Sequence, residues 1–139
     1  KILVDEQQKA VAAGSFPLQL EDPGANLTYA IANMGVNPAE LEKSMDAIIE
    51  DLQKNLVSEK EFQKLQNQIE NDFVSTNDNV QGIAESRANY EMYFGDANLI
   101  NTELDRYRKV TREDLRAAAN KYFNKNARVV LYWMPKTAP

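Results

Sequence analysis

The spacing of hydrophobic residues changes period twice along this chain, and the first period is that of strands. Apolar residues alternate with other residues in two runs, at Phe16, Leu18 and Leu20 and at Leu27, Tyr29 and Ile31. The segment Glu21-Asp22-Pro23-Gly24 between the runs favours a tight turn. A period of two on both sides of a turn predicts an antiparallel hairpin, with strands near residues 10–20 and 25–34. Pro17 indicates an edge position or a bulge in the first strand.

The period then becomes helical. Side chains that can cap a helix precede three of the apolar patterns: Asn37 before Pro38, Ser58 with Glu61, and Thr111 with Asp114. Each of these side chains can accept a hydrogen bond from an N–H group that the first helical turn leaves unpaired. Gly95-Asp96 ends another helical pattern. We therefore expect four or five helices after the hairpin.

The period changes back at the end of the chain. The run from Val129 to Met134 is β-branched and aromatic, and it is too short for a buried helix. It predicts a strand buried on both faces. Strand, strand, helices and strand in this order indicate a two-layer α+β fold, in which the strands near 10–20, 25–34 and 128–134 form one mixed or antiparallel sheet with helices on one face. A length of 139 residues fits a single domain, 1–139.

Composition narrows the range of functions. With 43% hydrophobic and 27% charged residues and no apolar run of spanning length, the chain predicts a globular protein without a membrane partner. A net charge of −5 and the lack of a Lys/Arg block argue against nucleic acid as the main partner. The chain contains no cysteine, so either a periplasmic or a cytoplasmic location is compatible with it.

The absence of histidine is more restrictive. Without histidine or cysteine, zinc loses its usual ligands, and nucleophilic systems of the Ser-His-Asp and Cys-His types are excluded. Residues 1–8 read as part of a helix with no cap before it, and there is no initiator Met. We therefore expect the sequence to be cut from a longer chain.

Three groups of residues are candidates for chemistry. The acidic pairs Asp5/Glu6, Glu21/Asp22 and Glu50/Asp51 consist of sequence neighbours, which point in different directions, so we interpret them as solvated surface. A second group, Asn77, Asn79, Gln81 and Gly82, imitates the start of a calcium-binding loop, but the twelfth position is Ala88 and the bidentate acid is missing. We reject that match.

The third group is an aromatic and basic patch that could bind a peptide. It consists of Arg87, Tyr90, Tyr93, Arg106, Tyr107 and Arg108. The structural interpretation is stronger, because tyrosines at helix-face spacing pack against neighbours and the arginines can pair with Glu91, Glu103 or Asp105. No substrate-binding residue is assigned.

A family resemblance rests on the order of motifs in the chain. The order runs from a Tyr through Phe94-Gly95, Ile100 and Leu104, Arg106-Tyr107, Val-Thr-Arg-Glu-Asp-Leu at 110–115 and Ala-Ala-Asn-Lys-Tyr-Phe at 118–123 to the closing apolar run. Upstream stand the Asp-Pro-Gly turn, the Asn-Pro helix start and the Ser-Glu-Lys-Glu-Phe helix start. The chain thus resembles the C-terminal half of an insulinase/pitrilysin-type (M16) zinc metallopeptidase domain over nearly its whole length.

The resemblance implies a LuxS/MPP-like metallohydrolase half-domain within a zinc-dependent endopeptidase that hydrolyses peptides or small proteins. In that family the His-x-x-Glu-His zinc motif lies in the preceding half. The resemblance therefore implies no catalytic residue, metal ligand or cofactor in residues 1–139, and zinc in the parent protein. Implied partners are the N-terminal catalytic half, a second M16 domain and a peptide substrate, and the implied location is the bacterial periplasm.

One segment departs from the family pattern. Lys9-Ala10-Val11-Ala12 stands where relatives often carry a Gly-Leu-Ala-Tyr-like entry that grips substrate, which argues against such a role for this half. Three hypotheses follow: a scaffold of the catalytic half that lines the substrate chamber, a catalytically inactive M16-like domain that binds an active partner, or an unrelated α+β interaction domain. The sequence upstream of Lys1 discriminates the first two, because it holds either an intact or a degenerate zinc motif.

Overall fold

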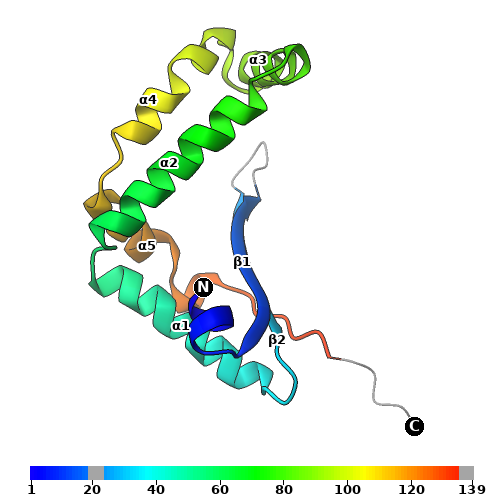
Figure 1. The fold of residues 1–139 in the computed structure, drawn as a ribbon, viewed down its shortest axis with the longest axis vertical. Coiled ribbons are helices and arrows are strands. Elements are labelled where there is room, and N and C mark those ends of the chain that lie inside the picture. Colours follow the sequence, from blue (N-terminus) through cyan, green and yellow to red (C-terminus); the bar gives the residue numbers. More distant parts are fainter. Residues whose placement is uncertain (19–23, 135–139) are drawn as a thin grey trace. The chain divides into compact units, whose positions relative to one another are not determined.

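The computed structural model describes residues 1–18 and 24–134, which form two compact units (Figure 1). Of the described residues, 1–18, 24–54 and 118–134 make up the hairpin unit, and 55–117 make up the helical unit. The elements are η1 (Ile2–Glu6, a π-helical turn), β1 (Ala10–Leu18), β2 (Ala25–Ala32), α1 (Pro38–Lys54), α2 (Glu59–Thr76), α3 (Val80–Phe94), η2 (Ala97–Asn101), α4 (Glu103–Arg108), α5 (Arg112–Tyr122) and η3 (Lys125–Ala127). The predicted α+β class is confirmed. Within the described ranges, no helix is both long and apolar enough to cross a membrane.

The predicted hairpin is present in the hairpin unit. β1 and β2 pair in antiparallel fashion, with Gly14 opposite Tyr29 and Phe16 opposite Leu27. The bulge lies between Ala10 and Ala12, whereas Pro17 pairs regularly with Asn26. Pro17 is tolerated because a strand of a two-stranded sheet has a free edge that needs no N–H donor. The predicted turn at 21–24 lies outside the described residues except for Gly24.

A small core joins the base of the hairpin to α1. Leu3, Ala10 and Leu41 are its buried members. Around them pack Val4, Ala30, Ala32, Val36, Met45 and Ile48. The strand residues in this core are alanines, so helix and hairpin approach closely and bury little area per residue.

A polar chain of contacts borders this core. The Lys9 Nζ donates to the buried hydroxyl of Ser44 over 2.8 Å, and that hydroxyl donates to the Glu40 carbonyl over 3.1 Å. The buried Ser44 hydroxyl therefore both accepts and donates a hydrogen bond, which avoids the cost of leaving it unsatisfied.

The prediction of a third strand in the sheet is wrong for the part of the chain that the structure describes. The sheet there contains β1 and β2 alone, and Val129 to Met134 carries no regular secondary structure and is exposed. A strand needs a neighbouring backbone to pair its N–H and C=O groups. Among the described residues none pairs with this segment, which instead contacts α1 through polar side chains.

The helix starts are those that the sequence predicts. The Asn37 Oδ1 accepts from the N–H of Ala39, and the Ser58 Oγ accepts from the N–H of Glu61. Thr111 and Asp114 form a reciprocal capping box. The Thr111 N–H donates to the Asp114 carboxylate over 2.9 Å, and the Thr111 Oγ1 accepts from the Asp114 N–H over 3.1 Å. These bonds lower the pKa of Asp114, with the Thr111 hydroxyl as the largest cause. Local chemistry therefore sets these boundaries.

The turn between α2 and α3 requires a glycine for space. A Cβ atom added to Gly82 would lie 1.8 Å from the carbonyl oxygen of Thr76, which is backbone and cannot rotate away. Asn79 caps α3 by accepting from the N–H of Gly82 over 2.9 Å. The cap and the missing side chain together allow the two helices to turn within a few residues.

Removal of a cap should destabilise the protein measurably. We expect Ser58→Ala and Thr111→Ala each to lower the free energy of unfolding by about 1 kcal/mol, because orphan N–H groups lose their acceptor. Thr102→Ala is the matched control, since Thr102 precedes α4 without a side-chain cap bond. Urea denaturation measures all three variants. Losses near zero for both capping variants would contradict the assigned helix starts.

Gly82→Ala should be more costly than an ordinary helix substitution. Relief of the contact with Thr76 requires a backbone shift, and overpacking of this kind typically costs about 1–3 kcal/mol. Gln81 precedes Gly82 in the first turn of α3 and is exposed, so Gln81→Ala should leave the midpoint of urea denaturation nearly unchanged. Equal stability of the two variants would show that the turn relaxes freely.

Candidate docking surface

The hairpin presents two chemically different faces. Because side chains alternate along a strand, directly paired residues share a face. One face carries the alanines that pack on α1, followed by Ser15, Asn26 and Thr28 toward the tip. These three polar side chains bond to one another, with Ser15 Oγ 2.7 Å from Asn26 Oδ1 and 3.0 Å from Thr28 Oγ1. The polar side chains near the tip of this face are therefore hydrogen-bonded to one another.

The opposite face of the hairpin is apolar and uncovered. It carries Ala12, Gly14, Phe16, Leu18, Ala25, Leu27, Tyr29 and Ile31. The large side chains in this set are all exposed, and Ile31 is 55% exposed. We call these eight residues the apolar sheet face. A charge-free row of aromatic and branched side chains is typical of the interface between two layers, and none of the described residues covers it here.

The two aromatic side chains of the apolar sheet face contact each other at its centre. Phe16 and Tyr29 pack edge to face with their ring centroids 6.5 Å apart. The Tyr29 ring lies across Gly14, where an added Cβ atom would come within 2.8 Å of the ring. Gly14 therefore leaves room for Tyr29 to lie along the sheet.

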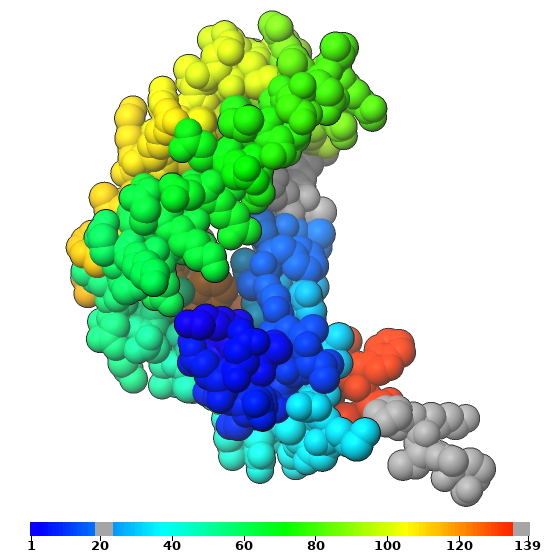
Figure 2. Space-filling view, viewed as in Figure 1, coloured from blue at the N-terminus to red at the C-terminus, as the bar shows by residue number. Residues whose placement is uncertain are grey.

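The segment from Val129 to Met134 adds a second apolar surface in the same unit. Its exposed fractions alternate, at 96% for Val129, 44% for Val130, 85% for Leu131, 48% for Tyr132, 91% for Trp133 and 60% for Met134. Such alternation is the pattern of an extended chain with one side turned to the protein. The orange-red atoms of this segment are visible at the surface in Figure 2.

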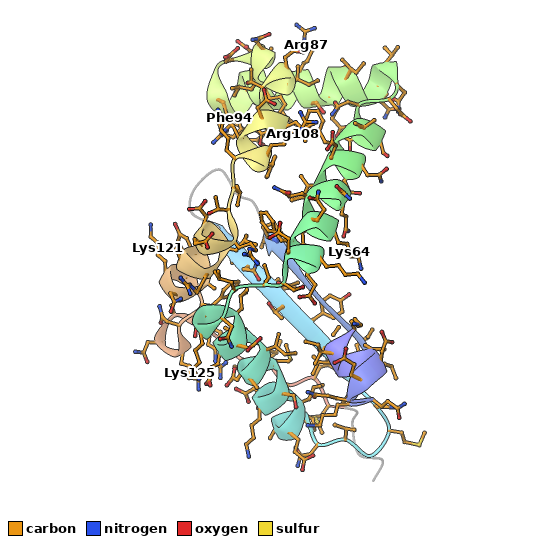
Figure 3. The ribbon with its side chains drawn as sticks, turned by 60° about the vertical axis from the view of Figure 1, so that its left-hand side comes forward. Lys64, Arg87, Phe94, Arg108, Lys121 and Lys125 are labelled. Atoms are coloured by element: carbon orange, nitrogen blue, oxygen red, sulfur yellow. The ribbon has the colours of Figure 1, made fainter. Side chains whose placement is uncertain are left out.

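Polar contacts hold this segment against α1. The guanidinium of Arg128 donates to the carboxylates of Asp46 and Glu42, at 2.6 Å from Glu42, and the Tyr132 hydroxyl donates to Glu42. Lys125, labelled in Figure 3, lies 3.2 Å from Glu50. Glu42, Asp46 and Glu50 are four residues apart and so share one side of α1. We call these six residues the α1 clamp.

The α1 clamp shifts the pKa of its members in the directions expected for matched partners. The hydrogen bond to Glu42 raises the pKa of Tyr132, and the bond to Asp46 raises the pKa of Arg128. The bond from Lys125 lowers the pKa of the Glu50 carboxyl, with a further contribution from its charge and from Lys54. At neutral pH these groups therefore hold the protonation states that favour the contacts.

The remaining candidate residues are structural wherever the structure describes them. Glu6 pairs with Lys1, and Glu50 pairs with Lys125 and Lys54, while Glu21 and Asp22 lie outside the described residues. In the calcium-loop imitation, Asn77 ends α2 and Asn79 caps α3. These asparagines thus act on the backbone.

The aromatic and basic patch also follows its structural interpretation. Arg106 pairs with Glu103 at 3.4 Å, and Arg108 pairs with Asp105 at 3.5 Å and with Glu70 of α2. Arg108 is labelled on α4 in Figure 3. Tyr90 packs against Phe94 with centroids 6.3 Å apart. Glu91, an expected partner for an arginine, accepts instead from the N–H of Ala97.

The α1 clamp was not predicted from the sequence. The acids at 42, 46 and 50 repeat at the helical period, which is a detectable signal, but exposed acids at this spacing are common on solvated helices. Their partners lie more than 70 residues later in the chain, as the pair Lys125–Glu50 illustrates. Contacts of that sequence separation depend on the fold.

The chain is similar to part of two longer proteases from Helicobacter pylori. It is 27% identical over 133 residues to the zinc protease PqqE of Helicobacter pylori, covering 96% of this chain and 30% of that protein. The crystal structure of a protease from Helicobacter pylori matches with a TM-score of 0.81 and 26% identity, over 90% of this chain and 30% of that one. The chain is related to M16-like zinc proteases. It spans about 30% of the length of these two proteins.

Two further structures share the fold at lower identity. An inactive peptidase domain from Bordetella parapertussis superposes with a TM-score of 0.77 at 20% identity, over 96% of this chain and 73% of that one. The periplasmic protease PqqL from Escherichia coli superposes with a TM-score of 0.62 at 19% identity, over 87% of this chain and 14% of that one. No family model matches the sequence.

The residues of this chain do not fit the zinc that the names of its relatives imply. The sequence contains neither histidine nor cysteine, and the described residues contain no group of three acidic side chains placed to hold a metal ion. Catalytic zinc sites are built from about three protein ligands that usually include imidazole or thiolate. We therefore derive no catalytic step from this chain.

The α1 clamp can be tested through its tyrosine. We expect Glu42→Ala to return the pKa of Tyr132 toward the ordinary tyrosine value, because the hydrogen bond to Glu42 is the largest cause of its increase. NMR titration of the Tyr132 ring carbon measures the change. Glu40→Ala, on an exposed position of the same helix, is the control. An unchanged Tyr132 pKa in Glu42→Ala would show that the clamp does not form in solution.

Proposed function

We propose that this chain is the non-catalytic C-terminal half of a peptidase domain in a longer zinc-dependent protease. Residues 1–139 act as one domain that scaffolds the catalytic half and lines the chamber in which peptides or small proteins are hydrolysed. The observation that carries this proposal is the apolar sheet face, which has the composition of a core layer and yet is uncovered.

The physical argument is one of missing burial. Full burial of a Leu, Ile or Phe side chain stabilises a fold by about 1.5–3 kcal/mol, and Phe16, Leu27 and Ile31 are each about half exposed. A second layer over the apolar sheet face therefore has a substantial driving force. The relatives from Helicobacter pylori are about three times as long as the matched region, which supports a covering layer within the same polypeptide.

The extended segment would contribute through its backbone. The residues Val129, Leu131 and Trp133 are exposed and offer one apolar side, while the α1 clamp fixes the other side. A strand with a free edge binds an extended polypeptide by forming ladder hydrogen bonds. We infer that this segment joins the sheet of the catalytic half.

In this proposal zinc and the general base belong to the N-terminal catalytic half. A second M16 domain and the peptide substrate are the further partners. The Escherichia coli relative of similar fold is named as a periplasmic protease, which supports a periplasmic location for the parent of this chain.

A second candidate function is an inactive M16-like domain that binds and assembles with an active subunit. The similarity to an inactive peptidase domain from Bordetella parapertussis favours it. The two functions differ in the preceding segment of the parent protein. An intact His-x-x-Glu-His supports the catalytic parent, and a degenerate motif supports the inactive one.

Two measurements test the zinc part of the proposal. We expect calorimetric titration of this chain with zinc to show no tight stoichiometric site, because imidazole and thiolate ligands are lacking. We expect the full-length parent protein to cleave peptides and to lose that activity with a chelator. An inert parent, or one indifferent to chelation, would favour the inactive domain.

Substitutions on the two hairpin faces provide the matched test of docking. We expect Leu27→Asp to lower the thermal stability and the cleavage rate of the full-length protein while leaving the isolated chain little changed, since Leu27 is already exposed there. Thr28→Asp, on the opposite and polar face, is the control. Equal effects of the two variants on the full-length protein would contradict docking through the apolar sheet face.

A further inference from the structure

A cavity in the helical unit has a lining that the proposed function does not use. It has a volume of about 320 Å³ and lies among α2, α3 and α4. Its lining consists of Ile69, Asp72, Phe73, Thr76, Asn77, Ser86, Tyr90 and Tyr107. We call it the tyrosine cavity. None of these eight residues is basic, although basic residues occur throughout the unit.

The polar groups of the tyrosine cavity are rich in hydrogen-bond acceptors. Asp72 contributes a carboxylate, which forms no ion pair with any described residue. The Asn77 amide nitrogen is occupied, because it donates to the Phe73 carbonyl over 2.9 Å. Its buried Oδ1 accepts no hydrogen bond within the described ranges, so the dipole of that carbonyl is uncompensated. The wall therefore offers the acceptor oxygens of Asp72 and Asn77, although the charge of Arg106 also acts on both tyrosines.

The aromatic rings are a second kind of group that attracts a cation. Phe73, Tyr90 and Tyr107 all line the tyrosine cavity, and the face of an aromatic ring attracts a cation. Burial raises the pKa of both tyrosines, and the negative charge of Glu103 raises it further. The phenols are therefore neutral at physiological pH.

The two arginines of α4 already form ion pairs. Arg106 pairs with Glu103, and Arg108 pairs with Glu70 and Asp105. Neither belongs to the lining. The carboxylate of Asp72 therefore pairs with neither arginine, although Arg108 lines the adjoining cleft.

A neighbouring cleft indicates what kind of molecule could carry that cation. It has a volume of about 220 Å³ and shares Ile69 and Tyr107 with the tyrosine cavity. Its wall includes the amide side chains of Gln63, Gln66 and Asn67 on α2, of which Gln63 donates to Asn67 over 3.0 Å, and the ion pair of Arg108 with Glu70. Amides supply both donors and acceptors, which match the N–H and C=O groups of an extended peptide.

We propose that the tyrosine cavity binds the protonated side chain of a lysine or arginine in a peptide whose backbone lies along the adjoining cleft. This inference rests on the proposed function, in which this half lines a peptide-containing chamber. It assigns to that chamber a preference for basic peptides. The aliphatic stem of the basic residue would contact Ile69 and Phe73, and its charge would face Asp72 and the rings.

The test compares two peptides that differ by one charge. Ac-Ala-Ala-Lys-Ala-Ala-amide and its norleucine counterpart are titrated into the full-length protein, with calorimetry for affinity and NMR of the Tyr90 and Tyr107 rings for location. We expect the lysine peptide to bind about five- to tenfold more tightly, as one cation–π contact with a carboxylate nearby would give. The difference should shrink at high salt because it is electrostatic.

Variants separate the tyrosine cavity from general acidity. Asp72→Asn should abolish the preference for lysine, whereas Asp78→Asn, an exposed acid of the same unit outside the lining, should preserve it. Equal affinity for both peptides, a preference that survives Asp72→Asn, or unmoved tyrosine resonances would overturn the proposal.

Failure of this inference is distinguishable from failure of the proposed function. Chelator-sensitive cleavage by the parent protein, measured separately, tests the proposed function. If the parent protein cleaves peptides but shows no preference for the lysine peptide that depends on Asp72, only the cavity assignment is overturned. A lysine preference without cleavage supports the cavity and counts against the peptidase.

Discussion

The alternation of side chains along the hairpin is the constraint on which the hairpin unit depends. Residues that pair across β1 and β2 share a face, so the sheet has two faces, and α1 covers only one of them. Alanines occupy the covered face, whereas the other face holds the large residues Phe16, Leu27 and Tyr29. Small residues permit the close approach of a helix, and large residues require a partner that can interdigitate with them. The alanine face of the hairpin therefore suits close packing with α1, and the apolar sheet face suits a partner with complementary side chains.

Charge organises the remainder of this unit. Core packing leaves one side of α1 free, and that side carries Glu42, Asp46 and Glu50. Arg128 and Lys125 neutralise these acids, and the Tyr132 hydroxyl completes the set. Exposed ion pairs contribute little stability individually. Their effect here is geometric, because they select which side of the 129–134 segment meets α1 and which side stays free.

Local features were predictable from the sequence and distant ones were not. The caps at Asn37, Ser58 and Thr111 involve residues within three positions of each other, so the sequence suffices to predict them. The hairpin was also predictable from its period. The period of two predicts that the hairpin has two faces, but it does not predict which face α1 covers. In the structure α1 covers the alanine face, so Leu27 and Ile31 lie outside the core. The run at 129–134 reads as a buried strand because its composition suits a sheet, while its pairing depends on a backbone that the described residues do not supply.

The short range of the helix caps has a consequence for the order of folding. Each cap forms between residues three or fewer positions apart, so α1, α2, α3 and α5 can start as soon as their own residues are available. Contacts close in sequence form quickly, whereas sheet layers formed from distant segments form slowly. The helices can thus begin to form while Phe16, Leu27 and Ile31 are still in contact with water. During that interval the exposed apolar side chains of the hairpin offer a surface for association with other chains.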